Sequence, residues 1–200
     1  MKSLTIDTLS LLVTTKTEVS LSTLEKELNQ RGYSLPFRPL PTFKGPLTLK
    51  KILTERIPNL GAVRYGEIDD ICLCIQVDHR LQRAHETLVT KAVPRSATGP
   101  DFKKIFIGSG DDYGEIVEAT LRIVPSPPHQ HRLKIVWPHQ DQKKKFLKKF
   151  WGSGVAPSRI IDKPSSLFIQ LEGLAEIVEG EKRAISSFAR GTKGKVTSLK

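Results

Sequence analysis

The apolar and polar positions of the first 125 residues predict short strands mixed with short helices. Alternation of apolar and mostly polar residues over 116–124 predicts a half-buried strand that ends at a proline. Leucines spaced along residues 21–28 share one face of a helix that ends at Gly32. Ser22 and Glu25 have the spacing of a capping box at its start. The other expected elements are strands over 4–14 and 68–77, a helix over 48–57, an extended proline-rich connector over 35–41, and turns at 64–66 and 96–100.

The pattern changes after the proline-rich residues 126–128. From there the expected order is strand, helix, strand, strand, helix, which is most of a ferredoxin-like unit. These elements are expected at 132–137, 141–151, 159–162, 167–172 and 174–190. Residues 191–200 are small, polar and basic, which predicts a disordered tail. The predicted fold class is α+β, with one unit over 1–126, a second, truncated unit over 127–190, and the basic tail.

The chain has 200 residues and a formal net charge of +11, which suits either solubility or an anionic partner. The charge is spread widely along the sequence, and its densest run lies on the expected helix over 141–151. Nucleic acid is one candidate partner of that helix. Its apolar positions argue against this interpretation, because at helical spacing they form a stripe of core type: Phe146, Leu147, Phe150 and Trp151.

Two cysteines, Cys72 and Cys74, lie on one expected strand among apolar neighbours. A disulfide across one strand residue would be badly strained, so buried reduced thiols are expected, as in a reducing compartment. The sequence has no apolar run of membrane-spanning length, and we expect a cytoplasmic protein without a membrane span. The histidines at 129, 131 and 139 have no further ligand at suitable spacing, so no metal site is expected.

Four segments carry a resemblance to a known family. They read RGYSLPFRPLP at 31–41, RYGEIDD at 64–70, TGPDF at 98–102 and GSGDDYGEIVEATLRIVP at 108–125. In this order they resemble motifs of the PCMH-type, vanillyl-alcohol oxidase-like FAD-binding oxidoreductases. The nearest group is that of the glycolate oxidase FAD-binding subunit and D-lactate dehydrogenase. The resemblance covers residues 8 to 190.

The resemblance implies that residues 1–126 form the second subdomain of an FAD-binding domain and that 127–190 form a truncated ferredoxin-like cap. The first subdomain, with its flavin loop, would precede residue 1 and is missing. A partner chain would then have to supply it. The implied activity is that of an FAD-linked 2-hydroxy-acid oxidase or dehydrogenase, and no residue is assigned as the catalytic base.

The resemblance also implies backbone contacts to FAD from a set of mostly small residues: Thr42, Gly45, Gly108, Ser109, Gly114 and Ile116. The sequence departs from the family at Lys44 and Pro46, and again at the acidic residues 111, 112 and 115. One uncompensated charge at about 4 Å from an anionic cofactor costs roughly 4 kcal/mol. Two alternatives therefore stay open: a degenerate, cofactor-free accessory or structural subunit, and a basic module that binds an anionic macromolecule.

Overall fold

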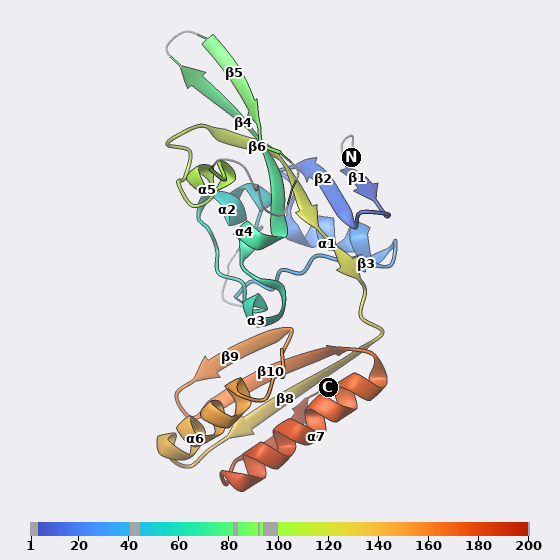
Figure 1. Ribbon diagram of the computed structural model, residues 1–200, viewed down its shortest axis with the longest axis vertical. Helices are drawn as coiled ribbons and strands as arrows, with labels where there is room; N and C mark the ends of the chain where they lie inside the picture. Colours follow the sequence, from blue (N-terminus) through green and yellow to red (C-terminus); the bar gives the residue numbers. More distant parts are fainter. Residues whose placement is uncertain (1–3, 41–44, 82–83, 92, 94–99, 200) are drawn as a thin grey trace. The chain divides into compact units, whose positions relative to one another are not determined.

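The computed structural model of the protein describes residues 4–40, 45–81, 84–91, 93 and 100–199. The chain divides into two compact units (Figure 1). Unit 1 contains Met1–Asn59 and Tyr65–Ser126, and unit 2 contains Leu60–Arg64 and Pro127–Lys200. The predicted turn at 96–100 lies almost entirely outside the described residues.

Unit 1 is built on a five-stranded antiparallel sheet with the strand order β1-β2-β6-β4-β5. Its strands are β1 (Leu4–Asp7), β2 (Leu12–Lys16), β4 (Cys72–Leu81), β5 (Ala84–Val89) and β6 (Glu115–Arg122). The predicted strand over 116–124 is confirmed as β6, which lies in the middle of the sheet. Ile116, Ala119 and Leu121 of β6 are buried, because the sheet packs one face against the core. A separate pair joins β3 (Tyr33–Ser34) to β7 (Val124–Pro125).

The short helices of unit 1 are α1 (Leu21–Asn29), α2 (Leu49–Thr54), α4 (Ile68–Ile71) and α5 (Lys103–Phe106). A further short helix, α3 (Ala62–Tyr65), falls mostly within the Leu60–Arg64 segment of unit 2. The leucines of α1 are buried, as their spacing predicts. The helix is capped by Ser20, whose hydroxyl accepts a hydrogen bond from the N–H of Thr23. The predicted Ser22–Glu25 capping box is wrong, because the carboxylate of Glu25 accepts from the N–H of Leu35 instead.

Two predicted strands have different boundaries in the structure. Residues 4–14 form the hairpin β1–β2 rather than one strand, because Asp7 Oδ1 accepts from the N–H groups of Leu9 and Ser10 and folds the chain back. The predicted strand over 68–77 begins only at Cys72. Residues 68–71 make one turn of helix, α4, which Glu67 and Asp70 cap reciprocally.

Unit 2 consists of β8 (His129–Val136), α6 (Gln140–Trp151), β9 (Arg159–Lys163), β10 (Ser166–Gly173), α7 (Ala175–Gly191) and β11 (Lys195–Leu199). Its antiparallel sheet has the order β11-β8-β10-β9. Both helices bury apolar residues in a core shared with one face of this sheet (Figure 1). The predicted βαββα order is confirmed, and the added strand makes the full βαββαβ order of a ferredoxin-like unit.

The prediction of a disordered tail over 191–200 is wrong. Residues 195–199 form β11, which pairs with β8 from Lys195 opposite Val136 to Leu199 opposite Arg132. Val196 packs against the core of unit 2. The indole Nε1 of Trp137 donates to Thr192 Oγ1 at 3.2 Å, which fixes the chain just before the strand. The tail is ordered because it closes an otherwise open sheet edge.

Candidate functional site

The loop between α5 and β6, together with the start of β6, contains four of the six predicted cofactor residues. These are Gly108, Ser109, Gly114 and Ile116. Thr42 lies outside the described residues. Gly45 is described: its φ of +97° lies in the region that favours glycine, and no atom would meet an added Cβ within 4 Å. Among the described glycines of the predicted set, Gly45 is therefore the one with open space beside its backbone.

The backbone N–H groups of this loop donate hydrogen bonds within the protein. Two of them meet carbonyls at the end of α2, and the others meet carbonyls of α5 and of the loop. The bonds run from Gly108 to Leu53 O (2.9 Å), Gly110 to Thr54 O (3.0 Å), Ser109 to Phe106 O (3.3 Å) and Gly114 to Asp111 O (3.2 Å). A phosphate cradle needs N–H groups that point at the ligand. Two of these donors cap α2 and the other two bond to α5 and within the loop, so the loop as described does not form such a cradle.

Side chains that pack against this loop from other segments explain two of its glycines. A Cβ on Gly108 would lie 3.1 Å from the Cβ of Arg56. Arg56 forms a two-point ion pair with the buried carboxylate of Asp69, through contacts of 3.1 and 2.5 Å. A Cβ on Gly114 would lie 2.7 Å from Val77 Cγ1 on β4. Both glycines are required for close packing whether or not a cofactor binds.

The acidic residues of the loop are compensated by a cation on α2. Lys50 Nζ lies 2.6 Å from Glu115 Oε1 and 3.5 Å from Asp111 Oδ2. The hydrogen bond to Glu115, together with the charge of Asp111, raises the pKa of Lys50 above its usual value. The electrostatic objection to an anionic ligand, which assumed uncompensated carboxylates, is therefore weaker at these two positions.

Asn59 is a buried residue whose hydrogen bonds the sequence does not predict. Its amide joins the proline-rich connector to the turn at Gly66, and only 4% of the residue is exposed. The bonds are Nδ2 to Pro36 O (3.1 Å), Nδ2 to Gly66 O (2.7 Å), and the N–H of Arg38 to Oδ1 (2.8 Å). The connector and the turn are two of the segments that carry the family resemblance. Nothing in the local pattern around residue 59 indicates this role, because its partners lie 7 to 23 residues away.

The two thiols are free and buried, which confirms the expectation from the sequence. Cys74 Sγ donates to Thr90 O at 2.8 Å, and a bulge in β4 separates the ladder partners of Cys72 and Cys74. Burial raises the pKa of Cys72 to about 12. A thiol held in this protonated form is neither a nucleophile nor a metal ligand near neutral pH.

We expect Cys72 of the folded protein to react with iodoacetamide only as fast as unit 1 opens. Near pH 8 its thiolate fraction should be about a thousandfold below that of the unfolded chain, since three pKa units separate about 12 from 9.0. The unfolded thiol loses its proton first, so folding stability should fall as pH rises from about 9 to 12. Urea melts across this range should show that fall, and Cys72→Ala should reduce it. Rapid labelling of Cys72 in native protein would contradict the burial.

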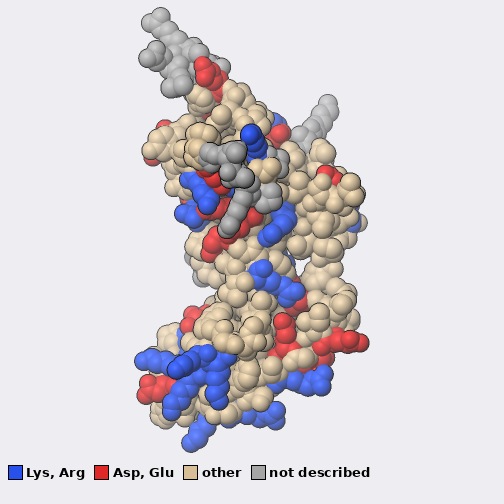
Figure 2. All heavy atoms as spheres, viewed as in Figure 1, with Lys and Arg blue, Asp and Glu red and all other residues tan. Residues whose placement is uncertain are grey.

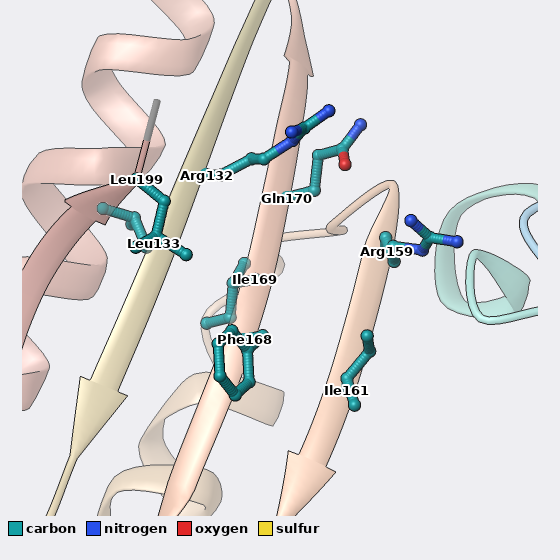
Figure 3. Close-up of a pocket in the computed structure, with 8 residues that line it drawn as sticks. All are labelled: Arg132, Leu133, Arg159, Ile161, Phe168, Ile169, Gln170 and Leu199. Carbon is teal, nitrogen blue, oxygen red and sulfur yellow. The ribbon is translucent and has the colours of Figure 1, made fainter. Parts of the chain in front are cut away.

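A groove of about 210 Å³ lies on the sheet of unit 2 (Figure 3). Its lining residues come from all four strands: Arg132, Leu133, Arg159, Ile161, Phe168, Ile169, Gln170 and Leu199. Figure 3 shows Arg132 and Gln170 close together at one end, with Phe168 and Ile161 further along the strands. The groove combines cationic and amide groups at one end with an apolar remainder.

The surroundings of the groove add positive charge. Lys134 Nζ lies 5.4 Å, and Lys163 Nζ 5.2 Å, from the centre of the Phe168 ring. Both ammonium groups are within the range of cation–π attraction. The groove therefore suits an anionic group that is joined to an apolar or planar body.

The expectation that charge is spread widely is wrong. Unit 1 carries 16 Lys and Arg against 15 Asp and Glu, whereas unit 2 carries 16 against six. Almost the entire excess of positive charge thus belongs to unit 2. Within the described ranges, no group of three or more His, Cys, Asp and Glu side chains could hold a metal ion. Nor does any helix in those ranges have the length and apolar content to cross a bilayer.

Comparison with known proteins identifies the fold. No family model matches the chain. Alkyldihydroxyacetonephosphate synthase of Caenorhabditis elegans is 27% identical over 128 residues, which are 63% of this chain and 20% of that protein. A solved structure of alkyldihydroxyacetonephosphate synthase has a TM-score of 0.85 and 20% identity over 99% of this chain. The BBE-like 1 protein of Physcomitrella patens has a TM-score of 0.65 and 16% identity over 99% of the chain.

The chain spans about a fifth of the C. elegans synthase and 42–43% of these solved structures. At such identities the structural likeness shows the fold. The placement next to glycolate oxidase and D-lactate dehydrogenase stays a prediction. The chain has an α+β fold that corresponds to part of a PCMH-type FAD-binding domain, followed by a ferredoxin-like unit.

Proposed function

We propose that the chain is an incomplete component of an FAD-linked oxidoreductase-like protein and that a partner chain supplies the missing flavin-loop subdomain. The observation that carries this proposal is the match of both units, in succession, to the synthase structure over 99% of the chain. The free, buried thiols fit a reducing location such as the cytoplasm.

In this proposal Gly45 is the residue of the predicted set that contacts the cofactor, because its backbone has open space beside it. The loop from Gly108 to Gly114 does not fit FAD as described, because the N–H groups of all three of its glycines are engaged within unit 1. The isolated chain therefore lacks donors at these positions. Cofactor binding would require the partner chain to provide the main phosphate contacts.

We further propose that the substrate is an anion recognised at the groove of unit 2. Arg132 and Arg159 suit a carboxylate or a phosphate, because a guanidinium binds either group through two parallel hydrogen bonds. A 2-hydroxy acid, as the resemblance implies, and a phosphate ester, as the synthase's name indicates, share this chemistry. The apolar groove around Phe168 favours an anion with an apolar portion.

We expect the purified chain to be colourless and to leave the fluorescence of added FAD unchanged. Protein isolated from its own source should instead co-purify with a partner and with flavin, which an absorbance spectrum and a mass measurement report together. Stoichiometric flavin in the isolated chain would contradict the proposed incompleteness.

A matched pair of glycine variants tests the site in that complex. Gly45→Ala and Gly110→Ala both place a Cβ at a position of positive φ where no atom lies within 4 Å. Only Gly45→Ala should lower the ratio of flavin to protein. Equal ratios in both variants would remove Gly45 from the site.

A cofactor-free accessory subunit is the second candidate. It is favoured by the internal use of the loop donors at Gly108, Ser109 and Gly114. A native complex that contains this chain and no flavin would support it against the first proposal.

A further inference from the structure

The outer face of α6 carries a cluster of cations. Four lysines are exposed there, and Trp151, at the end of the same helix, is 51% exposed. We call this set the α6 lysine face: Lys144, Lys145, Lys148, Lys149 and Trp151. Figure 2 shows Lys and Arg side chains gathered over the part of unit 2 that holds α6 in Figure 1. The prediction that Trp151 belongs to the core is wrong, because half of the residue is exposed and its ring meets Phe150 edge-on.

The inner face of α6 fixes the direction in which these side chains point. Phe146 and Phe150 are fully buried, and the Phe146 ring lies 4.9 Å from that of Trp137. Lys143 is also buried, where it pairs with Asp162 and donates to Lys163 O at 2.5 Å. The helix therefore cannot turn its lysines inward without losing the core of unit 2.

The lysine face is unfavourable for the isolated helix. Lys144 and Lys148, and likewise Lys145 and Lys149, stand at i and i+4, where like charges repel. Across the described part of the chain, none of the four forms an ion pair. Interaction with the helix dipole favours the lysines of the last turn, but it does not relieve this repulsion. An external anion bound to the face would relieve the repulsion.

We propose that the α6 lysine face docks unit 2 on an anionic lipid bilayer. Lysines hold their ammonium groups at the level of the lipid phosphates while their alkyl stems lie along the protein. A tryptophan beside them suits the boundary between headgroups and acyl chains. The surplus of ten positive charges in unit 2 adds attraction at longer range.

Lipid is favoured over nucleic acid by the composition and shape of the face. The face contains no arginine, which is the side chain that reads guanine and grips phosphate through paired hydrogen bonds. Single strands bind in grooves whose aromatic rings stack on successive bases. The α6 face is the outer surface of one helix and offers a single ring at its end.

The full chain should co-sediment with vesicles made of equal parts phosphatidylserine and phosphatidylcholine, and not with pure phosphatidylcholine. Each lysine near such a surface contributes about fivefold to the partition coefficient. The double variant K144Q/K148Q should therefore bind about 25-fold more weakly. Its fold should be intact by circular dichroism, because the change removes a repulsion.

The matched control is K26Q/K104Q, which removes the same charge from exposed lysines of unit 1. This variant should bind like the wild type. Equal losses in both double variants would overturn the proposal, because net charge alone would then explain binding. Absence of sedimentation with the anionic vesicles, or binding of a single-stranded oligonucleotide without binding of vesicles, would overturn it as well.

Trp151 provides an independent readout. The chain has two tryptophans, and Trp137 is only 2% exposed. Lipids brominated on their acyl chains should quench Trp151 in the bound protein and leave Trp137 bright. The Trp151→Phe variant should show no quenching, although its α6 lysines are unchanged. Unquenched Trp151 in sedimented protein would show that another surface makes the contact.

Discussion

Replacing Asn59 by alanine should lower the free energy of unfolding of unit 1 by about 3–5 kcal/mol. The change leaves the carbonyls of Pro36 and Gly66 and the N–H of Arg38 without their amide partner. An unpaired buried polar group costs about 1–3 kcal/mol, and the site is too enclosed for water to replace the whole amide. Urea unfolding, monitored by the labelling of Cys72 and Cys74, measures this effect, because both thiols belong to unit 1.

Asn29→Ala is the matched control. Asn29 lies exposed at the end of α1, and its amide oxygen makes one long contact of 3.4 Å with Ser126 Oγ. The free energy of unfolding of this variant should stay within about 0.5 kcal/mol of the wild-type value. If Asn59→Ala lowers the free energy of unfolding by less than about 1 kcal/mol, the amide is not the link between the connector and the turn.

Replacing Gly114 by valine should destabilise unit 1 by about 3–5 kcal/mol. A Cβ at this position would lie 2.7 Å from Val77 Cγ1 and 2.9 Å from His79 Cβ, so β4 would have to move away from the loop. The φ of +137° adds strain for any residue with a side chain. The midpoint of urea unfolding reports the loss.

Gly110→Ala in the same loop separates strain from collision. Gly110 also has a positive φ, of +66°, but no atom lies within 4 Å of its added Cβ. Gly110→Ala should lower the free energy of unfolding of unit 1 by about 1–2 kcal/mol. Equal costs for Gly110→Ala and Gly114→Val would refute the collision with β4. Because Gly114→Val perturbs the fold itself, its flavin content is no measure of cofactor contact.

Much of the fold could be predicted from the sequence where a periodic pattern decides the element. The alternation along 116–124 predicted β6, and the leucine spacing of α1 predicted its buried face. The boundaries depended on specific side chains instead. Asp7 turned one predicted strand into a hairpin, and the cap formed by Glu67 and Asp70 turned the start of another into a helix.

The candidate site could be predicted less well. The motif at 108–125 indicated the right fold, since the loop and β6 match what the fold requires. The same motif could not show where its N–H groups point. Gly108 and Gly110 donate to the carbonyls of Leu53 and Thr54, which lie more than fifty residues earlier in the chain. The compensation of Glu115 by Lys50 is equally remote in sequence.

The sequence by itself determined the periodic elements, the resemblance of the loop at 108–125, and the lysines of α6. Only the tertiary structure decided that residues 195–199 form a strand, that Trp151 is exposed, and that Asn59 joins two distant segments. The physical reason is the range of the interactions. Periodicity records which face of an element is apolar, whereas strand pairing and buried hydrogen bonds depend on partners that folding brings together.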